Sequence, residues 1–355
     1  MKKLISVTKG DGVGPEVISE AIKILKLISE YTDFEFELRE APAGGQVYKE
    51  SGTNLPKKSF ETIKSSDALL FGSVGLPDLP PGKAESAILK IRHGLDLYVN
   101  MRPIKLYEPL RDICPLKDEF IGKGIDMTII RENTEGLYAD IGGILKEDVA
   151  QNLMIYTRKG CERIIEYAFE SAKKMNHSTI TSVDKANLLK TSKFWRAIFL
   201  ETAKRYPSLK TESIYVDSFV QWIIRAPYAY QTVVTYNMFG DIISDEAAFL
   251  IGSLGMGSSG NIHPGKVSMY EPIHGTAPDI AGKGIANPIG AILSVKLMIQ
   301  ESFNSQDIAN QIEKSVEMAL KEGRTEDIKT KNLNTLSTEQ MGDLISEKLI
   351  KSLKG

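Results

Sequence analysis

The sequence of 355 residues is poor in several features that mark whole classes of protein. Its two cysteines, Cys114 and Cys161, are too few for the disulfide framework of a secreted domain, which favours a reducing compartment. No stretch approaches the ~18 apolar residues of a membrane-spanning helix, and the apolar run near Met1 is too short for a signal peptide. We therefore expect a cytoplasmic protein without a membrane segment.

Neither sign of charge dominates the chain. Lysine and arginine together number 44 against 46 aspartates and glutamates, a formal net charge of −2 at pH 7. This balance argues against a nucleic-acid partner. The composition, 42% hydrophobic and 25% charged, is that of a globular chain, and the length fits two domains.

Short apolar runs alternate with amphipathic segments along the chain. Apolar runs predict strands at residues 4–7, 68–71, 127–130, 213–216 and 233–235. Apolar residues at helical spacing predict helices at residues 17–28, 291–299 and 308–320, with others after Asn237 and from Gln340. This alternation predicts an α/β fold with much parallel sheet.

A glycine-rich turn, Gly-Asp-Gly-Val-Gly-Pro at residues 10–15, follows the first predicted strand. The Rossmann fingerprint needs G-x-G-x-x-G, but here the third glycine comes one residue early and proline follows it. A tight strand-to-helix turn accounts for these glycines as well as a binding role does. We therefore look for a cofactor site elsewhere in the chain.

Arginine is used sparingly, with 11 arginines against 33 lysines, yet Arg92, Arg102 and Arg131 fall within one short stretch. Arg131 directly follows a predicted strand, and ligands bind at the carboxyl ends of such strands in α/β sheets. A guanidinium matches a carboxylate in two parallel hydrogen bonds. Any one of these arginines is explained by a surface ion pair, whereas the three together favour a substrate with two or more carboxylates.

Two carboxylates are spaced as a metal site requires. Asp241 and Asp245 lie at i and i+4 of a predicted helix, where like charges repel unless a cation lies between them. Asp217 is a plausible third oxygen ligand. The four histidines show no HExxH spacing, so an all-oxygen site for Mg²⁺ or Mn²⁺ is favoured over zinc. The alternative is a helix-capping Asp241 with a solvated Asp245.

Five motifs, in order along the chain, resemble those of the β-decarboxylating dehydrogenases, the family of isopropylmalate, isocitrate, homoisocitrate and D-malate/tartrate dehydrogenases. They are GDGVGPEV at 10–17, RENTEGLYA at 131–139, VDKANLLKTSKFWR at 183–196, NMFGDIISDEAA at 237–248 and HGTAPDIAGKGIANP at 274–288. The resemblance implies a two-domain isopropylmalate-dehydrogenase-like α/β fold that is not Rossmann, with parallel or mixed sheets flanked by helices. Residues 1–99 with 253–355 would bind the cofactor, and residues 100–252 would bind substrate and metal and form a homodimer, with the active cleft between the two domains.

Family members oxidise a 2-hydroxy acid at C2 with a nicotinamide cofactor and then release the carboxylate β to the new ketone. The resemblance implies that Asp217, Asp241 and Asp245 bind Mg²⁺ or Mn²⁺, with Asp217 also beside the substrate. It makes Lys185 the base that accepts the hydroxyl proton and Tyr138 the acid that protonates the product carbon. It also implies that the site is shared, since Lys185 and Asp217 would serve the partner subunit's site.

The resemblance also implies which nicotinamide is used. Asp279 can accept hydrogen bonds from a free ribose 2′-OH and repels a 2′-phosphate, and it is followed by Ile280 where NADP-preferring members place a tyrosine, so NAD is expected. Asn287 would contact the adenine. The full set of expected cofactor residues is Gly72, Gly75, Glu85, Glu271, His274, Gly275, Thr276, Ala277, Pro278, Asp279, Ile280, Ala281, Gly282 and Asn287.

The substrate is expected to be a small 2-hydroxy dicarboxylate, distinguished by side chains near Arg92. Substrate discrimination falls on Glu85, Ile88 and Leu89. The aliphatic Ile88 and Leu89, with Leu188, offer an apolar wall that suits an isopropyl group and gives a third carboxylate no partner. This favours 3-isopropylmalate, converted to 2-oxo-4-methylpentanoate in leucine biosynthesis. RENTEGLY instead leans toward the isocitrate, homoisocitrate and tartrate branches, and DLYVNMRP toward D-malate, so these remain alternatives.

A different class of function is a non-catalytic regulatory subunit of such an enzyme. Subunits of this kind typically lose catalytic or metal-binding residues. Lys185, Tyr138 and all three aspartates are present here, which argues against that alternative.

Overall fold

The computed structural model describes residues 1–139 and 141–354, which divide into two compact units. Unit 1 comprises Met1–Leu97, Tyr107–Cys114 and Gly252–Gly355, and unit 2 comprises Tyr98–Leu106 and Pro115–Ile251. The segment Tyr107–Cys114, which the expected boundaries assign to the middle domain, therefore belongs with unit 1. The roles expected for the two domains stay predictions.

Unit 1 is an α/β unit built from both ends of the chain. Its elements are β1 (Lys2–Gly10), α1 (Gly14–Tyr31), β2 (Glu35–Glu40), α2 (Gly45–Ser51), α3 (Lys57–Lys64), β3 (Ala68–Ser73), α4 (Ser86–Gly94), η1 (Glu108–Ile113), η4 (Leu254–Met256), β11 (Ser258–Ile262), β12 (Ser268–Pro272), α10 (Ile289–Glu301), α11 (Gln306–Leu320), β13 (Gly323–Arg324), η5 (Glu326–Ile328), β14 (Asn334–Thr335) and α12 (Thr338–Lys354).

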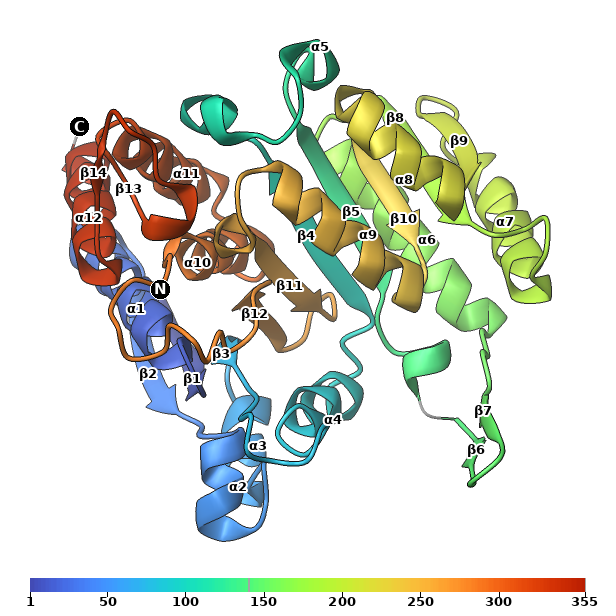
Figure 1. Ribbon diagram of the computed structural model, residues 1–355, viewed down its shortest axis with the longest axis horizontal. Coiled ribbons are helices and arrows are strands. Elements are labelled where there is room, and N and C mark those ends of the chain that lie inside the picture. Colours follow the sequence, from blue (N-terminus) through green and yellow to red (C-terminus); the bar gives the residue numbers. More distant parts are fainter. Residues whose placement is uncertain (140, 355) are drawn as a thin grey trace. The chain divides into compact units, whose positions relative to one another are not determined.

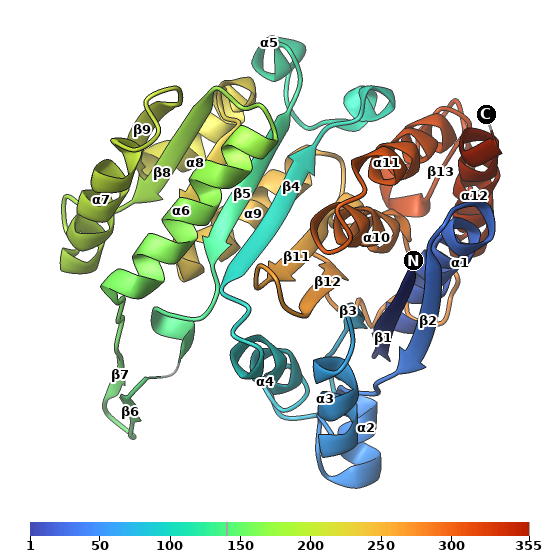
Figure 2. The same ribbon diagram turned by 180° about the vertical axis from the view of Figure 1, so that it is seen from behind.

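The strands of unit 1 lie in the order β2-β1-β3-β12-β11, and only β11 and β12 pair antiparallel. On one side of β3, Leu69 and Phe71 pack with Ile63 of α3, Ile91 of α4 and Met269 of β12 in a fully buried cluster. Helices α1, α10, α11 and α12 pack against one another, and α10 lies against β11 and β12 (Figure 2). Every residue of β3 is buried. Because side chains alternate between the two faces of a strand, both faces of β3 must be covered, which explains its almost entirely apolar sequence.

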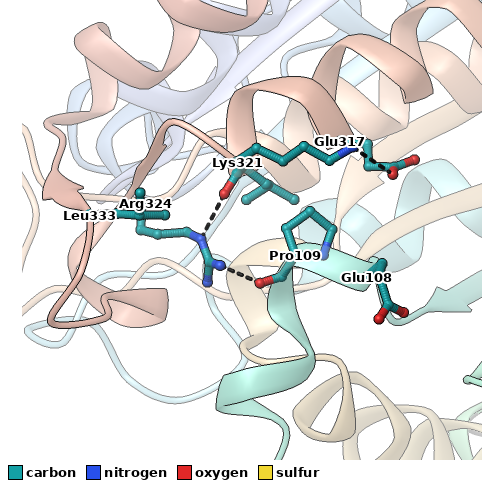
Figure 3. Close-up of a pocket in the computed structure, with 7 residues that line it drawn as sticks. Glu108, Pro109, Glu317, Lys321, Arg324 and Leu333 are labelled. Atoms are coloured by element: carbon teal, nitrogen blue, oxygen red, sulfur yellow. Dashed lines mark hydrogen bonds and ion pairs between the residues drawn. The ribbon is translucent and has the colours of Figure 1, made fainter.

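Arg324 explains why residues 107–114 belong to unit 1. Its buried guanidinium donates from Nε to the Leu320 carbonyl at the end of α11 (2.9 Å) and from Nη2 to the Pro109 carbonyl of η1 (Figure 3). One cation thus satisfies a helix-end carbonyl and holds η1 against α11. An open pocket of about 350 Å³ beside it contains none of the expected site residues and is lined by Glu108, Pro109, Glu317, Leu320, Lys321, Arg324 and Leu333.

Unit 2 is built from the middle of the chain and is also α/β. Its elements are β4 (Val99–Lys105), α5 (Asp118–Ile121), β5 (Asp126–Glu132), η2 (Leu137–Ala139), β6 (Gly143–Leu145), β7 (Ala150–Asn152), α6 (Arg158–Lys174), β8 (Thr179–Asp184), α7 (Lys190–Ala203), β9 (Lys210–Tyr215), α8 (Val216–Arg225), η3 (Pro227–Ala229), β10 (Thr232–Thr235) and α9 (Asn237–Leu250).

The sheet strands of unit 2 lie in the order β4-β5-β10-β8-β9, with only β4 and β5 antiparallel. Helix α9 covers one face of β4 and β5 (Figure 1), and α6 covers the opposite face of β5 and β10 (Figure 2). The strands β6 and β7 form a separate antiparallel hairpin. The parallel strands β5, β8, β9 and β10 all end at one edge of the sheet, and Arg131, Lys185, Asp217 and Asn237 lie at or just after those ends.

The expected α/β class and the mostly parallel sheet are confirmed, and each segment predicted as a helix overlaps one. One local prediction was wrong, because Val216 begins α8 instead of ending a strand: the backbone of Tyr215 is extended and the chain turns into helix directly after it. No helix in the described residues combines the length and apolar character that a membrane crossing requires.

Candidate functional site

Arg131, at the end of β5, is the centre of a polar cluster in unit 2. Its side chain is 3% exposed, and it donates from Nε and Nη2 to the Asn237 Oδ1 (3.0 and 2.6 Å) and from Nη1 to the Asp241 carboxylate. Gly240 makes this packing possible, because a Cβ there would lie 2.6 Å from the Arg131 Cγ. The first two turns of α9 thus fix the guanidinium in one orientation.

Arg102 of β4 forms the second part of the cluster. It is buried and donates from Nη1 to the Ser244 hydroxyl (2.6 Å) and to the Asp245 carboxylate (2.8 Å), and its Nη2 lies 3.7 Å from Asp241. Among the described residues its buried Nε finds no acceptor. A buried guanidinium N–H without a partner is costly, so this group suits an added anion.

Tyr138, in η2, lies beside the same cluster. The Arg131 guanidinium carbon is 5.7 Å from the centre of the Tyr138 ring. Burial and the neighbouring Asp241 carboxylate, which also hydrogen-bonds the phenol, raise the pKa of Tyr138. The phenol therefore keeps its proton at neutral pH, as a general acid must.

The three aspartates expected to bind a metal do not gather within one chain. Asp241 and Asp245 share one face of α9 in the arginine cluster, whereas Asp217 lies in the first turn of α8 and pairs with Lys185. Across residues 1–139 and 141–354, no three His, Cys, Asp or Glu side chains are close enough to hold a metal ion. The two half-exposed carboxylates of α9 nevertheless fit a hard divalent cation in their donor chemistry.

Lys185 directly follows β8, and its ammonium pairs with the Asp217 carboxylate. This hydrogen bond lowers the pKa of Asp217, which is therefore ionised at neutral pH. The preceding residue, Asp184, is fully buried and forms a bidentate ion pair with Arg196 (2.8 and 2.7 Å). Asp184 also accepts from the Ala186 N–H (2.8 Å), so the backbone on both sides of Lys185 is held.

In unit 1, Arg92 is tied to Glu271, an expected cofactor residue. Arg92 Nη2 donates to the Glu271 Oε1 at 3.0 Å, and Asn261 Nδ2 donates to the same oxygen at 2.7 Å. The Arg92 Nε is buried, with no acceptor among the described residues. Arg92 thus resembles Arg102 in having a buried Nε whose N–H is available to an anion.

Several expected cofactor residues come together in unit 1. A Cβ on Gly75 would lie 3.0 Å from the Glu85 carboxylate and 3.5 Å from the Thr276 Cγ2, so both ends of the segment between β3 and α4 meet the loop after β12 there. His274 follows β12, and burial lowers its pKa, so the ring is neutral. Its Nδ1 contacts the Gly275 carbonyl (2.9 Å), while its Nε2 is buried and unpaired among the described residues. That unpaired nitrogen is available to a ligand.

The rest of the expected cofactor segment is a surface loop. Asp279 is exposed and Ile280 is half-buried, and the exposed or half-buried loop also contains Gly275, Ala277, Pro278, Ala281 and Gly282. Asn287 differs, because its amide is used inside unit 1. It donates to Asp327 (3.1 Å) and accepts from the Ile289 N–H (3.0 Å). These bonds do not favour the expected adenine contact through its side chain, which stays a prediction.

The residues expected to distinguish substrates differ in exposure. Ile88 packs against the core cluster of β3, α3 and α4, so helix packing accounts for much of its apolar character. Leu89, on the same helix, is 39% exposed, and Leu188 of unit 2 is 71% exposed. Of the expected apolar wall, Leu89 and Leu188 therefore have surface to offer a ligand.

Sequence reasoning missed the side chains that hold the arginines in place. Asn237 precedes Asp241 by four residues, as Asp241 precedes Asp245, so the three share one face of α9. Extending the four-residue spacing one turn toward the start of the helix would have identified Asn237 as a member of the site. Nothing comparable marks Asn261 or Ser244, whose roles depend on contacts between segments distant in sequence.

Comparisons with known proteins identify the family of this chain. The family model described as isocitrate/isopropylmalate dehydrogenase matches residues 4–345. The 3-isopropylmalate dehydrogenase of Aquifex aeolicus is 44% identical, covering 98% of this chain and 98% of the relative. That of Thermotoga maritima is also 44% identical, covering 97% of this chain and 98% of the relative.

A solved structure gives the same result for the fold. The crystal structure of isocitrate dehydrogenase from Methylococcus capsulatus superposes with a TM-score of 0.87 at 33% identity, covering 98% of this chain and 99% of that one. Sequence and fold agree over nearly the whole length. The chain belongs to the isocitrate/isopropylmalate dehydrogenase family.

Proposed function

We propose that the protein oxidises 3-isopropylmalate with NAD and decarboxylates the product to 2-oxo-4-methylpentanoate, with Mg²⁺ or Mn²⁺ bound. The observation that carries this proposal is the cluster in which Arg102 and Arg131 meet Asp241 and Asp245 beside Tyr138. The curated relatives named 3-isopropylmalate dehydrogenase, at 39–44% identity, support this substrate. Leucine biosynthesis in the cytoplasm is the process in which we place this reaction.

The chain's own residues divide the work. Arg92, Arg102 and Arg131 bind the two carboxylates, and the unpaired Nε atoms of Arg92 and Arg102 favour an added anion. Lys185 would take the C2 hydroxyl proton as a neutral amine, after its own ammonium has lost a proton. Tyr138, whose pKa is raised, delivers a proton to the carbon that loses CO₂.

Two bound groups complete the chemistry: NAD supplies a hydride acceptor, and a divalent cation supplies a Lewis acid. Asp241 and Asp245 would hold the cation, with Asp217 contributed by a second subunit. The exposed Asp279 carboxylate would accept a hydrogen bond from the ribose 2′-OH of NAD, where a 2′-phosphate would be repelled.

Leu89 and Leu188 support an isopropyl group as the distinguishing part of the substrate. Burial of such a group is worth roughly 1.5–3 kcal/mol, whereas a carboxylate against the same side chains would lose its hydration without a partner. Ile88 contributes less to this wall because it packs into the core.

One activity panel tests the proposal. Purified protein is assayed with NAD or NADP, with or without Mn²⁺, against 3-isopropylmalate, D-malate, tartrate, isocitrate and homoisocitrate. We expect the highest kcat/KM with 3-isopropylmalate, NAD and metal. A higher value with isocitrate or D-malate would overturn the substrate assignment, and no turnover with any of them would favour the regulatory-subunit alternative.

We also propose a homodimer that shares its active sites. Unit 2 exposes large apolar side chains on the β6–β7 hairpin, where Leu145 is 87% exposed, and on α8 and α9, at Trp222, Ile242 and Phe249. Apolar surface of this kind is typical of an interface. A second copy would cover it and would bring Lys185 and Asp217 to the partner's site.

Complementation between inactive variants tests this sharing. Lys185→Ala and Asp245→Ala are each expected to be inactive, but random mixing of subunits makes half of the dimers mixed, and each mixed dimer has one intact site. We expect recovery of about one quarter of wild-type activity, given an isologous dimer. The matched control mixes Lys185→Ala with Asp217→Ala, whose mixed dimers have no intact site. If neither mixture recovered activity although ultracentrifugation showed dimers, the result would contradict a shared site.

A further inference from the structure

The glycine-rich turn at residues 10–15 carries a carboxylate with an unusual set of partners. Asp11 is 4% exposed and accepts three backbone N–H groups, from Gly45 (2.6 Å), Gln46 (2.9 Å) and Gly75 (3.0 Å). Both of its oxygens are used. Asp11 thereby joins the start of α2 to the loop after β3, which carries Gly75.

Glu16, in the first turn of α1, likewise accepts hydrogen bonds from the backbone of a second loop. Its two carboxylate oxygens accept from the backbone N–H groups of Gly282 and Gly284, the latter at 3.1 Å. Both glycines have positive φ, +75° and +66°, so their N–H groups face Glu16 through a backbone conformation that other residues rarely adopt. The loop that contains Asp279 is therefore anchored at its far end to α1.

The main chain of the turn touches the same two loops. The Asp11 N–H donates to the Ser73 carbonyl (2.6 Å), and the Val13 N–H donates to the Thr276 carbonyl (2.9 Å). A Cβ on Gly12 would lie 2.1 Å from that Thr276 oxygen, so only glycine allows the approach. The turn thus lies against the loop after β3 and the loop after β12.

We propose that Asp11 and Glu16 are positioning residues that hold the two cofactor loops, residues 74–85 and 274–284, in their binding conformation before NAD arrives. This inference rests on the proposed use of NAD. The glycine-rich turn that departs from the Rossmann fingerprint would thus act on the cofactor through the loops it anchors. Loops ordered in advance lose less conformational entropy on binding, which strengthens affinity without a direct contact.

The two carboxylates make separable predictions. Asp11→Asn replaces one carboxylate oxygen with an NH₂ group, which cannot accept a hydrogen bond from a backbone N–H. The anchoring of loop 74–85 is therefore weakened. In Glu16→Gln the same change weakens that of loop 274–284. Hydrogen exchange measured without cofactor is expected to accelerate about tenfold in the loop that each variant affects, and little in the other, since a hydrogen bond to a charged group is worth roughly that factor.

Cofactor binding supplies the second readout. We expect each variant to raise the Kd for NAD about tenfold. In Glu16→Gln, the kcat at saturating NAD and the KM for the 2-hydroxy acid should stay within about twofold, because loop 274–284 contains no expected substrate residue. ADP, which keeps the adenosine diphosphate part of NAD, should bind more weakly to Glu16→Gln, because loop 274–284 contains Asp279, which is expected to bind the adenosine ribose.

Asp67→Asn is the matched control. Asp67 accepts the Leu4 N–H at 2.7 Å in the same unit and touches neither loop. We expect this variant to leave NAD affinity and loop exchange unchanged. Unchanged exchange of both loops in Asp11→Asn and Glu16→Gln, or faster exchange throughout unit 1, would overturn the proposal. If the wild type binds no NAD, the proposed cofactor is wrong, yet the exchange measurement still decides whether the carboxylates anchor the loops.

Discussion

Replacing Asn237 with alanine removes the one acceptor shared by two N–H groups of Arg131. The Asn237 Oδ1 receives both Nε and Nη2 of that guanidinium, while the Asn237 Nδ2 donates to the Glu135 carbonyl at 3.1 Å. Arg131 and Asn237 are each 2% exposed, so bulk water has no direct route to the donors left behind. The substitution therefore removes two hydrogen bonds from a buried cation.

The size of the effect follows from this burial. A hydrogen bond to a charged group is worth about 1.5–3 kcal/mol, and a domain of this size loses about 2–4 °C in Tm for each kcal/mol. We expect Asn237→Ala to lower Tm by about 3 to 12 °C. Because Arg131 can then leave its orientation, kcat/KM for the 2-hydroxy acid should fall about 10- to 100-fold, one decade for each 1.4 kcal/mol.

Calorimetry and initial-rate assays measure both quantities on the same protein. Asn237→Asp keeps an acceptor at this position, so its Tm should lie closer to that of the wild type. Asn310→Ala, which removes an exposed amide on α11, is the control for the substitution itself and should change stability by less than about 0.5 kcal/mol. If Asn237→Ala matched the wild type in Tm and in kcat/KM, Asn237 would not be what orients Arg131.

Three further predictions concern the cofactor, the acid and the pH dependence of stability. Asp279→Lys with Ile280→Tyr should move preference from NAD toward NADP, measured as the ratio of the two kcat/KM values; an unchanged ratio would count against the assignment. Tyr138→Phe should lower kcat about 10²- to 10⁴-fold without a comparable change in NAD affinity, as expected for loss of a general acid. Burial lowers the pKa of His177 below its unfolded value of about 6.5, so the protein should lose stability as pH falls from that value toward the folded pKa. His177→Gln should flatten that part of a plot of Tm against pH, and an unaltered slope would show that His177 does not contribute.

The sequence predicted the fold well where one periodicity dominated. The fully buried strand β3 and the helix α1, with its regular apolar face, both appear where the pattern indicated. The pattern did not reveal that residues 107–114 join unit 1, because that depends on Arg324, which lies more than 200 residues away in the chain. Contacts of that separation leave no periodic trace in a single sequence.

The candidate site was predictable to a similar degree. The spacing of Asp241 and Asp245 indicated one face of a helix, and both lie on α9. The spacing did not reveal that each carboxylate would pair with an arginine from a different strand. Nor did the spacing reveal that Asp217 pairs with Lys185, because that contact joins residues from two different strand ends.

The pairing of charges in unit 2 has a consequence for how ligands bind. Arg102 and Arg131 together carry two positive charges, and Asp241 and Asp245 carry two negative charges, so the cluster is balanced before any ligand arrives. A dicarboxylate alone must compete with the aspartates for the guanidinium groups, and a divalent cation alone must compete with the arginines for the carboxylates. When both ligands bind, the net charge of the cluster is unchanged. The dication would bind the aspartates and free the arginines, and the dianion would bind the freed arginines. Binding of one should therefore strengthen binding of the other by the same factor, since such coupling is reciprocal. Titration of Mn²⁺ with and without a dicarboxylate measures this coupling, and equal metal affinity in both titrations would refute it.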